Sequence, residues 1–238
     1  MTTIAIGIGD NKNILNAIDT FDDKNIDFKL IYDDAELIDS ILNPEIDAVI
    51  RGSLPASKVM KNLKSRFNDK FIFRATYIID KDDEFLLTPV GIDEGNTIEN
   101  KLKIAIECGN FLEKQKIKPK IAVLADGRKG DYGRSKRISE SIDESEKLTS
   151  LIKEKTSFNV KNYYILIEKA IEDKCNVIIA PDGIFGNVLF RSLVLINSWP
   201  SYGAVTFGLS DIYIDTSREQ SKEGYVRAIE LAYKLAKR

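Results

Sequence analysis

Short apolar runs alternate with amphipathic segments along the first third of the chain. The runs are rich in β-forming residues and predict strands over Thr3–Ile8, Phe28–Tyr32 and Ala48–Ile50. The segments between and after them carry apolar residues at helical spacing and predict helices over Asn11–Phe21, Ala35–Leu42 and from Pro55 onward. This alternation is typical of a parallel sheet covered by helices, and such sheets bind ligands at the carboxyl ends of their strands.

The rest of the chain adds a hairpin and further strands and helices. The runs Phe71–Asp80 and Phe85–Val90 predict an antiparallel hairpin with the charged run Lys81–Glu84 as its solvated turn. Later β-forming runs cover Lys120–Ala125, Val177–Ala180 and Tyr202–Ile214. Helices are predicted from Asn96 or Thr97, over Ser141–Lys155, Tyr163–Ile171 and Asn187–Ile196, and from Gln220 and Ser221 to the end. The glycine-containing stretch Gly91–Thr97 is typical of a hinge.

The stretch Asp215–Ser221 joins the last β-forming run to the last helix and carries candidate chemistry. The Ser217 hydroxyl, the Arg218 guanidinium and the N–H groups of a helix start suit an anion. Local residues alone favour an ordinary turn, in which Ser221 is the N-cap and Asp215 a turn former. The two interpretations stay open at this level.

A second candidate is the loop 126–135, which follows the run Lys120–Ala125. Gly127 and Gly130 allow close approach of backbone N–H groups to a ligand, and Arg128 and Lys129 supply positive charge. The alternative is a solvated loop whose charges serve solubility. Arg51, Gly52 and Ser53 also follow the end of a predicted strand, and so do Asp182 and Asn187. Asp182 and Asn187 could contact a ligand, or they could serve only as a turn residue and a helix cap.

Composition narrows the function classes. The chain has 238 residues, a formal net charge of −2 and no histidine, which excludes Ser–His and Cys–His nucleophile pairs and any zinc site that needs histidine. The charge and the scarcity of aromatic residues in the basic loop argue against a nucleic-acid partner. Two cysteines in apolar segments, no signal peptide and no membrane-length apolar run predict a cytoplasmic protein without a metal site.

Five segments, taken in order, resemble the phosphate acetyltransferase/butyryltransferase superfamily. The segment from Asp47 resembles its DGLVSGAxHST motif, and Asn96–Asn110 with Pro119–Leu124 resembles NPTxEQLAxIAxxSA…PKVAMLS. Asp126–Gly130 falls on the STKGS substrate loop, Asn176–Asn187 resembles NVLIFPNLxAGN, and Asp215–Ser221 resembles DLSRGxS. The chain is similar to the short methanogen branch of the superfamily, the methyltransferase-related MtxX family, also called methanogenesis marker protein 4.

The resemblance implies an α/β fold of the two-lobed isocitrate/isopropylmalate dehydrogenase-like type. It implies a first lobe of residues 1–93 and 216–238, a second lobe of residues 94–215 and an interlobe cleft. The ligand would be a small anion of the phosphate, acyl phosphate or coenzyme A type. The superfamily resemblance implies a homodimer, and the methanogen branch implies an archaeal source. The ligand residues it implies are Arg51, Ser53, Gly127, Arg128, Lys129, Gly130, Asn187, Ser217 and Arg218.

This sequence departs from the acetyltransferases at the motif glycine, which is Glu219 here, at the hydroxyl residues of the STKGS loop and at the catalytic aspartate. Their catalytic aspartate follows the motif serine by seven residues, and this position is Gly224 here; the neighbouring Glu223 points about 100° away on a helix. Catalytic residues are therefore not assigned. The implied function is anion binding with acyl- or methyl-group transfer, and the alternative is a non-catalytic accessory or ligand-binding protein. Dehydrogenase activity is the weakest alternative, because no nucleotide fingerprint is present.

Overall fold

The structure, a computed structural model, describes residues 1–21, 25–68 and 70–237 and divides the chain into two compact units. Unit 1 contains Met1–Arg74 and Pro200–Arg238, and unit 2 contains Ala75–Trp199. These bounds differ from those of the expected lobes, 1–93 with 216–238 and 94–215. Most of the hairpin belongs to unit 2 and the run Tyr202–Ile214 belongs to unit 1. The two-lobed division around a cleft stays a prediction.

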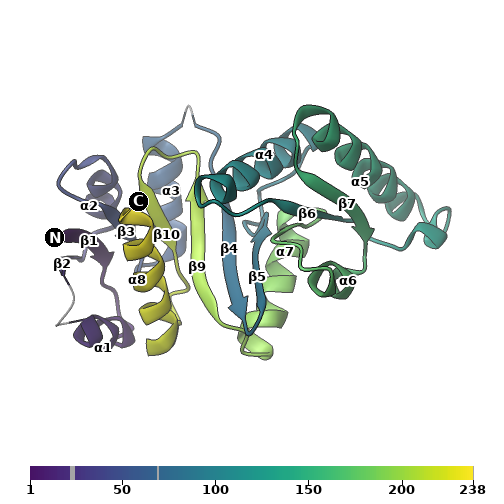
Figure 1. The fold of residues 1–238 in the computed structure, drawn as a ribbon. Helices are drawn as coiled ribbons and strands as arrows, with labels where there is room; N and C mark the ends of the chain where they lie inside the picture. Colours follow the sequence, from purple (N-terminus) through teal and green to yellow (C-terminus); the bar gives the residue numbers. More distant parts are fainter. Residues whose placement is uncertain (22–24, 69, 238) are drawn as a thin grey trace. The chain divides into compact units, whose positions relative to one another are not determined.

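The sheet of unit 1 confirms the predicted alternation of strands and helices (Figure 1). Its strand order is β2-β1-β3-β10-β9. The four strands from β2 to β10 run parallel, and β9 is antiparallel to β10. The strands are β1 (Thr2–Gly7), β2 (Ile26–Ile31), β3 (Ala48–Ile50), β9 (Ser201–Phe207) and β10 (Ile212–Asp215).

The helices of unit 1 bury the apolar positions that predicted them. They are α1 (Asn13–Ile18), α2 (Asp34–Asp39), α3 (Ala56–Arg66) and α8 (Lys222–Ala236), with 3₁₀ turns at Asp19–Phe21 and Ser40–Leu42. Val59 and Leu63 of α3 pack in one core cluster with Val49 and Tyr213 of the sheet. Tyr225, Ala228, Ile229 and Ala232 of α8 are each 0% exposed. Full burial of a large apolar side chain contributes roughly 1.5–3 kcal/mol.

The sheet of unit 2 has the strand order β4-β5-β8-β6-β7. The predicted hairpin is confirmed, since β4 and β5 pair antiparallel, whereas β5, β8, β6 and β7 run parallel. The strands are β4 (Phe73–Asp80, whose first two residues belong to unit 1), β5 (Asp83–Thr88), β6 (Lys120–Leu124), β7 (Asn159–Tyr164) and β8 (Val177–Ile179). The sequence pattern missed β7, and the helix expected over Tyr163–Ile171 begins only at Ile167.

Two helices of unit 2 begin earlier than the sequence predicts. α5 begins at Lys136 with Ser135 as its N-cap, and α7 begins at Gly183 with Asp182 as its N-cap, so Asn187 is not the cap. The Asp182 carboxylate accepts the Phe185 N–H at 2.7 Å. The helices are α4 (Ile98–Lys114), α5 (Lys136–Lys155), α6 (Ile167–Glu172) and α7 (Gly183–Phe190), with a 3₁₀ turn at Lys129–Asp131 and a π-helical turn at Arg191–Ile196.

The helices of unit 2 cover its strands. α4 and α5 pack against each other and against β6, while α6 packs on β7 and α7 on β5 (Figure 1). The strand β8 is buried along its whole length, which is typical of a parallel strand covered on both faces. Throughout the described ranges, each helix is too short or too polar to cross a membrane.

Candidate functional site

The carboxyl ends of three parallel strands in unit 1 bring distant segments together. Ile6 of β1 and Ile214 of β10 both pair with Ile50 of β3, so these strands end side by side. The segments that follow them are 8–12, 51–55 and 216–221. We call the last of these, residues 216–221, the β10–α8 corner. The structure thus places four predicted ligand residues, Arg51, Ser53, Ser217 and Arg218, at one edge of one sheet.

Arg51 and Ser53 lie inside this edge. Arg51 is 4% exposed; its Nε donates to Asp215, and its Nη1 donates to the Leu54 carbonyl at 2.6 Å. Arg74 donates to the other Asp215 oxygen at 3.0 Å. Ser53 is 0% exposed, and its hydroxyl accepts the Gly9 N–H at 2.8 Å. In this structure the contacts of both residues connect segments of unit 1. A direct contact of either residue with a ligand stays a prediction.

Asp215 is the acid at the centre of this arrangement. Burial raises the pKa of its carboxyl, but the guanidinium groups of Arg51 and Arg74 outweigh burial and hold the pKa below its ordinary value. The ionised carboxylate therefore stays bound to both arginines at neutral pH. Thr216, the next residue, donates its hydroxyl hydrogen to the Gly52 carbonyl at 2.8 Å, which joins the corner to the end of β3.

Long-range hydrogen bonds hold the backbone of the β10–α8 corner. The Asn11 amide donates to the carbonyls of Arg218 and Gln220, each at 3.0 Å. The buried Tyr225 hydroxyl donates to the carbonyls of Ser217 and Arg218 at 3.1 and 3.0 Å. Burial raises the pKa of Tyr225 to about 12, so this hydroxyl remains a donor. The conformation of the corner is therefore set by other parts of unit 1.

The side chains of Ser217 and Arg218 remain accessible on this fixed backbone. Ser217 is half-buried, and its hydroxyl accepts the Glu219 N–H at 3.3 Å. The Arg218 side chain is 53% exposed, and within the described residues its carboxylate partner is the neighbouring Glu219 at 3.1 Å. An exposed guanidinium beside a hydroxyl, on a backbone that is already ordered, suits an incoming phosphate or carboxylate.

A side chain at position 224, at the start of α8, would have to displace the Gln220 side chain. A Cβ at Gly224 would lie 2.2 Å from Cδ of Gln220 and 2.4 Å from Cγ, because the Gln220 side chain lies against this glycine. Ser221 is the N-cap, as one of the two interpretations predicted, and its hydroxyl accepts the Gly224 N–H at 3.1 Å. The Glu223 carboxyl bonds to its own backbone N–H and to Ser221, which lowers its pKa. Gly224 has no carboxylate and the pKa of Glu223 is lowered, so neither residue supplies a carboxylate that is more basic than usual.

The loop 126–135 of unit 2 is held by its own residues and by the adjacent helix α5. The Arg128 N–H donates to Asp131 at 2.8 Å, and the Arg134 guanidinium donates to the same carboxylate at 2.8 Å, which lowers the pKa of Asp131. Lys129 lies 3.8 Å from Glu146 and is 77% exposed. Gly127 is buried, whereas Gly130 is exposed. The loop is charged and accessible, but its contacts are local.

Asn187 and Asp126 lie near the carboxyl ends of β8 and β6 in unit 2. The half-buried Asn187 donates its amide to the Val90 carbonyl at 3.0 Å. Arg137 donates to Asp126 Oδ2 at 2.8 Å, and Asp126 Oδ1 is buried without a hydrogen-bond partner. The described residues contain no group of three or more metal-binding side chains.

Sequence reasoning did not select the residues that order the corner. Asn11 follows Gly9 and Asp10, directly after the first strand. The carboxyl ends of parallel strands lie at the same edge of a sheet, so its position in the sequence could have placed Asn11 near the corner. Tyr225 is indistinguishable in sequence from the other apolar residues on its face of α8. Arg74 and Gln220 carry no local pattern that marks a site.

Sequence comparison identifies relatives over nearly the whole chain. An uncharacterized methyltransferase of Methanocaldococcus jannaschii is 41% identical over 235 residues, which cover 95% of both chains. A putative methyltransferase mtx subunit X of Methanosarcina mazei is 35% identical over 223 residues, covering 93% of this chain and 75% of the relative. The chain belongs to the family of methyltransferase mtx subunit X. No protein-family model matches it.

Comparison with solved structures identifies the fold of this chain. A branched-chain phosphotransacylase from Enterococcus faecalis matches with a TM-score of 0.74 at 15% identity, covering 99% of both chains. An isocitrate dehydrogenase from Methylococcus capsulatus matches with a TM-score of 0.62 at 11% identity, covering all of this chain and 88% of the other. The predicted phosphate acetyltransferase-like and dehydrogenase-like fold is therefore confirmed, and these low identities establish the fold alone.

Proposed function

We propose that this protein binds a small phosphate- or carboxylate-bearing ligand at the β10–α8 corner of unit 1. The observation that carries the proposal is the fixed backbone of Ser217 and Arg218, which Asn11 and Tyr225 hold while the Arg218 guanidinium stays 53% exposed. A site ordered before binding spends less free energy on ordering when the ligand arrives. An acyl phosphate or coenzyme A-type compound is the ligand class that the phosphotransacylase fold supports.

The same geometry argues against orthodox acyl transfer to coenzyme A. Such a reaction needs a general base close to the thiol, and general bases with raised pKa are the effective ones near neutral pH. Position 224 is a glycine packed against Gln220, and the pKa of Glu223 is lowered. We therefore place ligand binding first, in keeping with an accessory or ligand-binding role in methanogen metabolism.

Group transfer is the second candidate function, and the relatives' names favour it. The relatives are called methyltransferases or methyltransferase subunits, and the structural neighbours include phosphotransacylases. Transfer without a carboxylate base would rely on electrostatic stabilisation by Arg218 and on positioning. Coupled assays with coenzyme A and acyl phosphates test acyl transfer. Equal inactivity of the wild type and Arg218→Ala would contradict it while leaving the binding proposal intact.

Thermal-shift measurements test the binding proposal. Inorganic phosphate, acetyl phosphate, butyryl phosphate and coenzyme A are the probes. A ligand present at ~100 times its Kd stabilises the native state by about 2.7 kcal/mol, which is a readily detected shift in melting temperature. We expect a shift with at least one phosphate-bearing probe and a smaller shift for Arg218→Ala. No shift with any probe would contradict the proposal.

The second group of predicted ligand residues, Gly127–Gly130 and Asn187, belongs to unit 2. Their contact with the same ligand stays a prediction. Lys129→Ala is the suitable variant, because Lys129 is 77% exposed and its removal leaves no buried charge. If the prediction holds, this variant weakens binding of the probe that shifts the wild type.

A further inference from the structure

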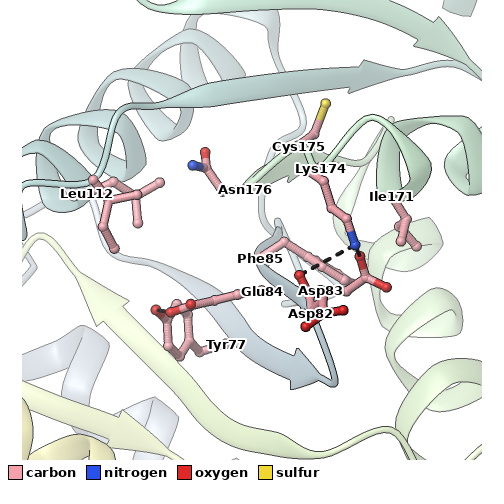
Figure 2. A pocket seen from close by; sticks show the side chains of 11 residues that line it. Tyr77, Asp82, Asp83, Glu84, Phe85, Leu112, Ile171, Lys174, Cys175 and Asn176 are labelled. Atoms are coloured by element: carbon pink, nitrogen blue, oxygen red, sulfur yellow. Dashed lines mark hydrogen bonds and ion pairs between the residues drawn. The ribbon is translucent and has the colours of Figure 1, made fainter.

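Unit 2 contains a cavity that is separate from the segments considered above. Its volume is about 160 Å³, and it is lined by the β4–β5 hairpin, the end of α4 and the connection from α6 to β8 (Figure 2). The lining includes Asp83, where β5 begins, and Asn176, which precedes β8. Because β5 and β8 run parallel, the cavity lies at their amino ends. Asp182 follows the opposite, carboxyl end of β8.

Apolar side chains form the walls of this cavity. Phe85 and Leu112 are 1% and 2% exposed, and Ile117 and Ile171 are half-buried. A dry cavity of about 150 Å³ with such walls is large enough to hold a benzene ring. The cavity therefore matches the apolar body of a small organic molecule that is about the size of one ring.

The polar lining is strongly acidic and short of donors. The hairpin supplies the carboxylates of Asp82, Asp83 and Glu84, and Lys174 is the one cation among the described lining residues. The Lys174 ammonium lies 2.6 Å from Asp83 Oδ1, as Figure 2 shows, and this contact raises its pKa. The hydroxyl of the buried Tyr77 donates to Glu84.

The one amide side chain among the described lining residues, that of Asn176, is held by contacts within the fold. The Asn176 amide donates to the Lys118 carbonyl at 2.9 Å, and its oxygen accepts the Lys120 N–H at 2.7 Å. Three carboxylates against one ammonium leave the lining with a net charge of two negative units. Each carboxylate has about four acceptor positions, which is more than the lining's own donors fill. A ligand would therefore be expected to bring both positive charge and N–H donors.

We propose that this cavity binds a small organic ammonium ion whose apolar body is about the size of one ring. The body packs against Leu112 and Ile117, and the ammonium donates to Glu84, which lies beside Tyr77. A carboxylate or phosphate of the same size is repelled by the acidic lining, and a neutral analogue loses the charge attraction. The site does not depend on anion binding at the β10–α8 corner.

Benzylammonium, benzyl alcohol and benzoate are matched probes for this site, because they share one ring and differ in charge. Calorimetric titration of the full chain should give saturable binding of benzylammonium. Benzyl alcohol should bind at least about fivefold more weakly, since a charge pair near the surface is worth about 1 kcal/mol or more. Benzoate should not bind, and added salt should weaken benzylammonium binding. Equal binding of the three probes, or no binding of benzylammonium, would overturn the proposal.

Two variants locate the binding within the protein. Glu84→Gln removes one charge and keeps an oxygen that accepts from Tyr77, so it should weaken benzylammonium at least about fivefold and leave benzyl alcohol unchanged. Glu113→Gln is the matched control, because Glu113 is an exposed residue of α4 outside the cavity lining. If both variants bind benzylammonium as the wild type does, the cavity is not its site.

Discussion

Two charged segments of this protein follow the carboxyl ends of parallel strands, yet they are built differently. The β10–α8 corner receives hydrogen bonds from Asn11 and Tyr225, and Asn11 is more than two hundred residues away in sequence. The loop 126–135 is held by contacts among Arg128, Asp131 and Arg134 and by the helix α5 that directly follows it. The corner is ordered by residues far away in sequence, whereas the loop is ordered by residues within about one helix of it in sequence.

This difference has consequences for function. A guanidinium on a backbone that is fixed from several directions meets a ligand at a lower ordering cost than one on a locally held loop. We therefore expect the larger share of anion affinity to come from the corner. Changes that release the corner should cost both stability and binding, whereas comparable changes in the loop should cost little stability.

Asp215→Ala should give the largest effect on stability. It removes the carboxylate that Arg51 and Arg74 share, and Arg51 is 4% exposed, so a buried charge loses its partner. Breaking a buried pair from one side costs about 3–5 kcal/mol. Urea denaturation measures the loss. Asp131→Ala in the loop is the control and should cost clearly less, because its partner Arg134 is exposed to solvent. Equal losses would contradict the comparison.

The pH dependence of stability follows from the same carboxyl. The pKa of Asp215 is lowered in the folded state, so its contribution is present above the unfolded-state pKa, which is about 3.9. That contribution is lost as the pH falls through the lower folded-state pKa. Denaturation at a series of pH values should show acid destabilisation below about pH 4 that Asp215→Asn diminishes. If Asp215→Asn loses stability at low pH as much as the wild type does, other carboxylates account for the acid destabilisation.

Gly224→Asp should be the next largest change. Its Cβ would meet the Gln220 side chain at 2.2 Å; overpacking costs about 1–3 kcal/mol, and the low end applies here because the half-buried Gln220 side chain can shift. Gly130→Ala in the loop is the control, because a Cβ there meets nothing within 4 Å. Combining Gly224→Asp with Gln220→Ala should recover part of the stability. Full stability of Gly224→Asp alone would mean that Gln220 moves aside freely.

Tyr225→Phe should have a smaller effect. It removes the hydroxyl that donates to the carbonyls of Ser217 and Arg218, and a hydrogen bond of this kind contributes about 1 kcal/mol. Tyr132→Phe is the matched control in the loop, since its hydroxyl donates to Asp143 at an exposed position. Denaturation of both variants measures the difference. A similar small loss for both would remove the argument that Tyr225 orders the corner.

Local patterns predicted much of the fold. The strands β1 and β3, the β4–β5 hairpin, the Ser221 cap and the buried face of α8 all follow from periodicity and capping residues near in sequence. The strand β7 was missed because Asn159–Tyr164 buries only Val160 and Tyr163 and otherwise carries polar residues. The start of α7 was missed because both Asp182 and Asn187 suit a cap, and only the structure distinguishes them.

The candidate site was less predictable than the fold, since its partners are distant in sequence. Arg51 follows a strand, where ligand-binding residues are often found, but it is buried and pairs with Asp215, which is 164 positions away in sequence. The segment 216–221 was identified from sequence, whereas the roles of Asn11 and Tyr225 depend on which strands become neighbours. Charge and glycine content identified the loop 126–135, but they did not show that Asp131 pairs with Arg134 and that Asp126 pairs with Arg137 of α5.

The most direct test of anion binding at the corner compares two arginines of unit 1. Arg218 and Arg66 are 53% and 51% exposed, and each pairs with one exposed carboxylate, at 3.1 and 3.3 Å. Calorimetric titration with coenzyme A and with inorganic phosphate should show that Arg218→Ala weakens binding by about tenfold or more, as loss of a charge-assisted bond does. Arg66→Ala should bind as the wild type does. Equal affinities of Arg218→Ala, Arg66→Ala and the wild type would contradict an anion site at this corner.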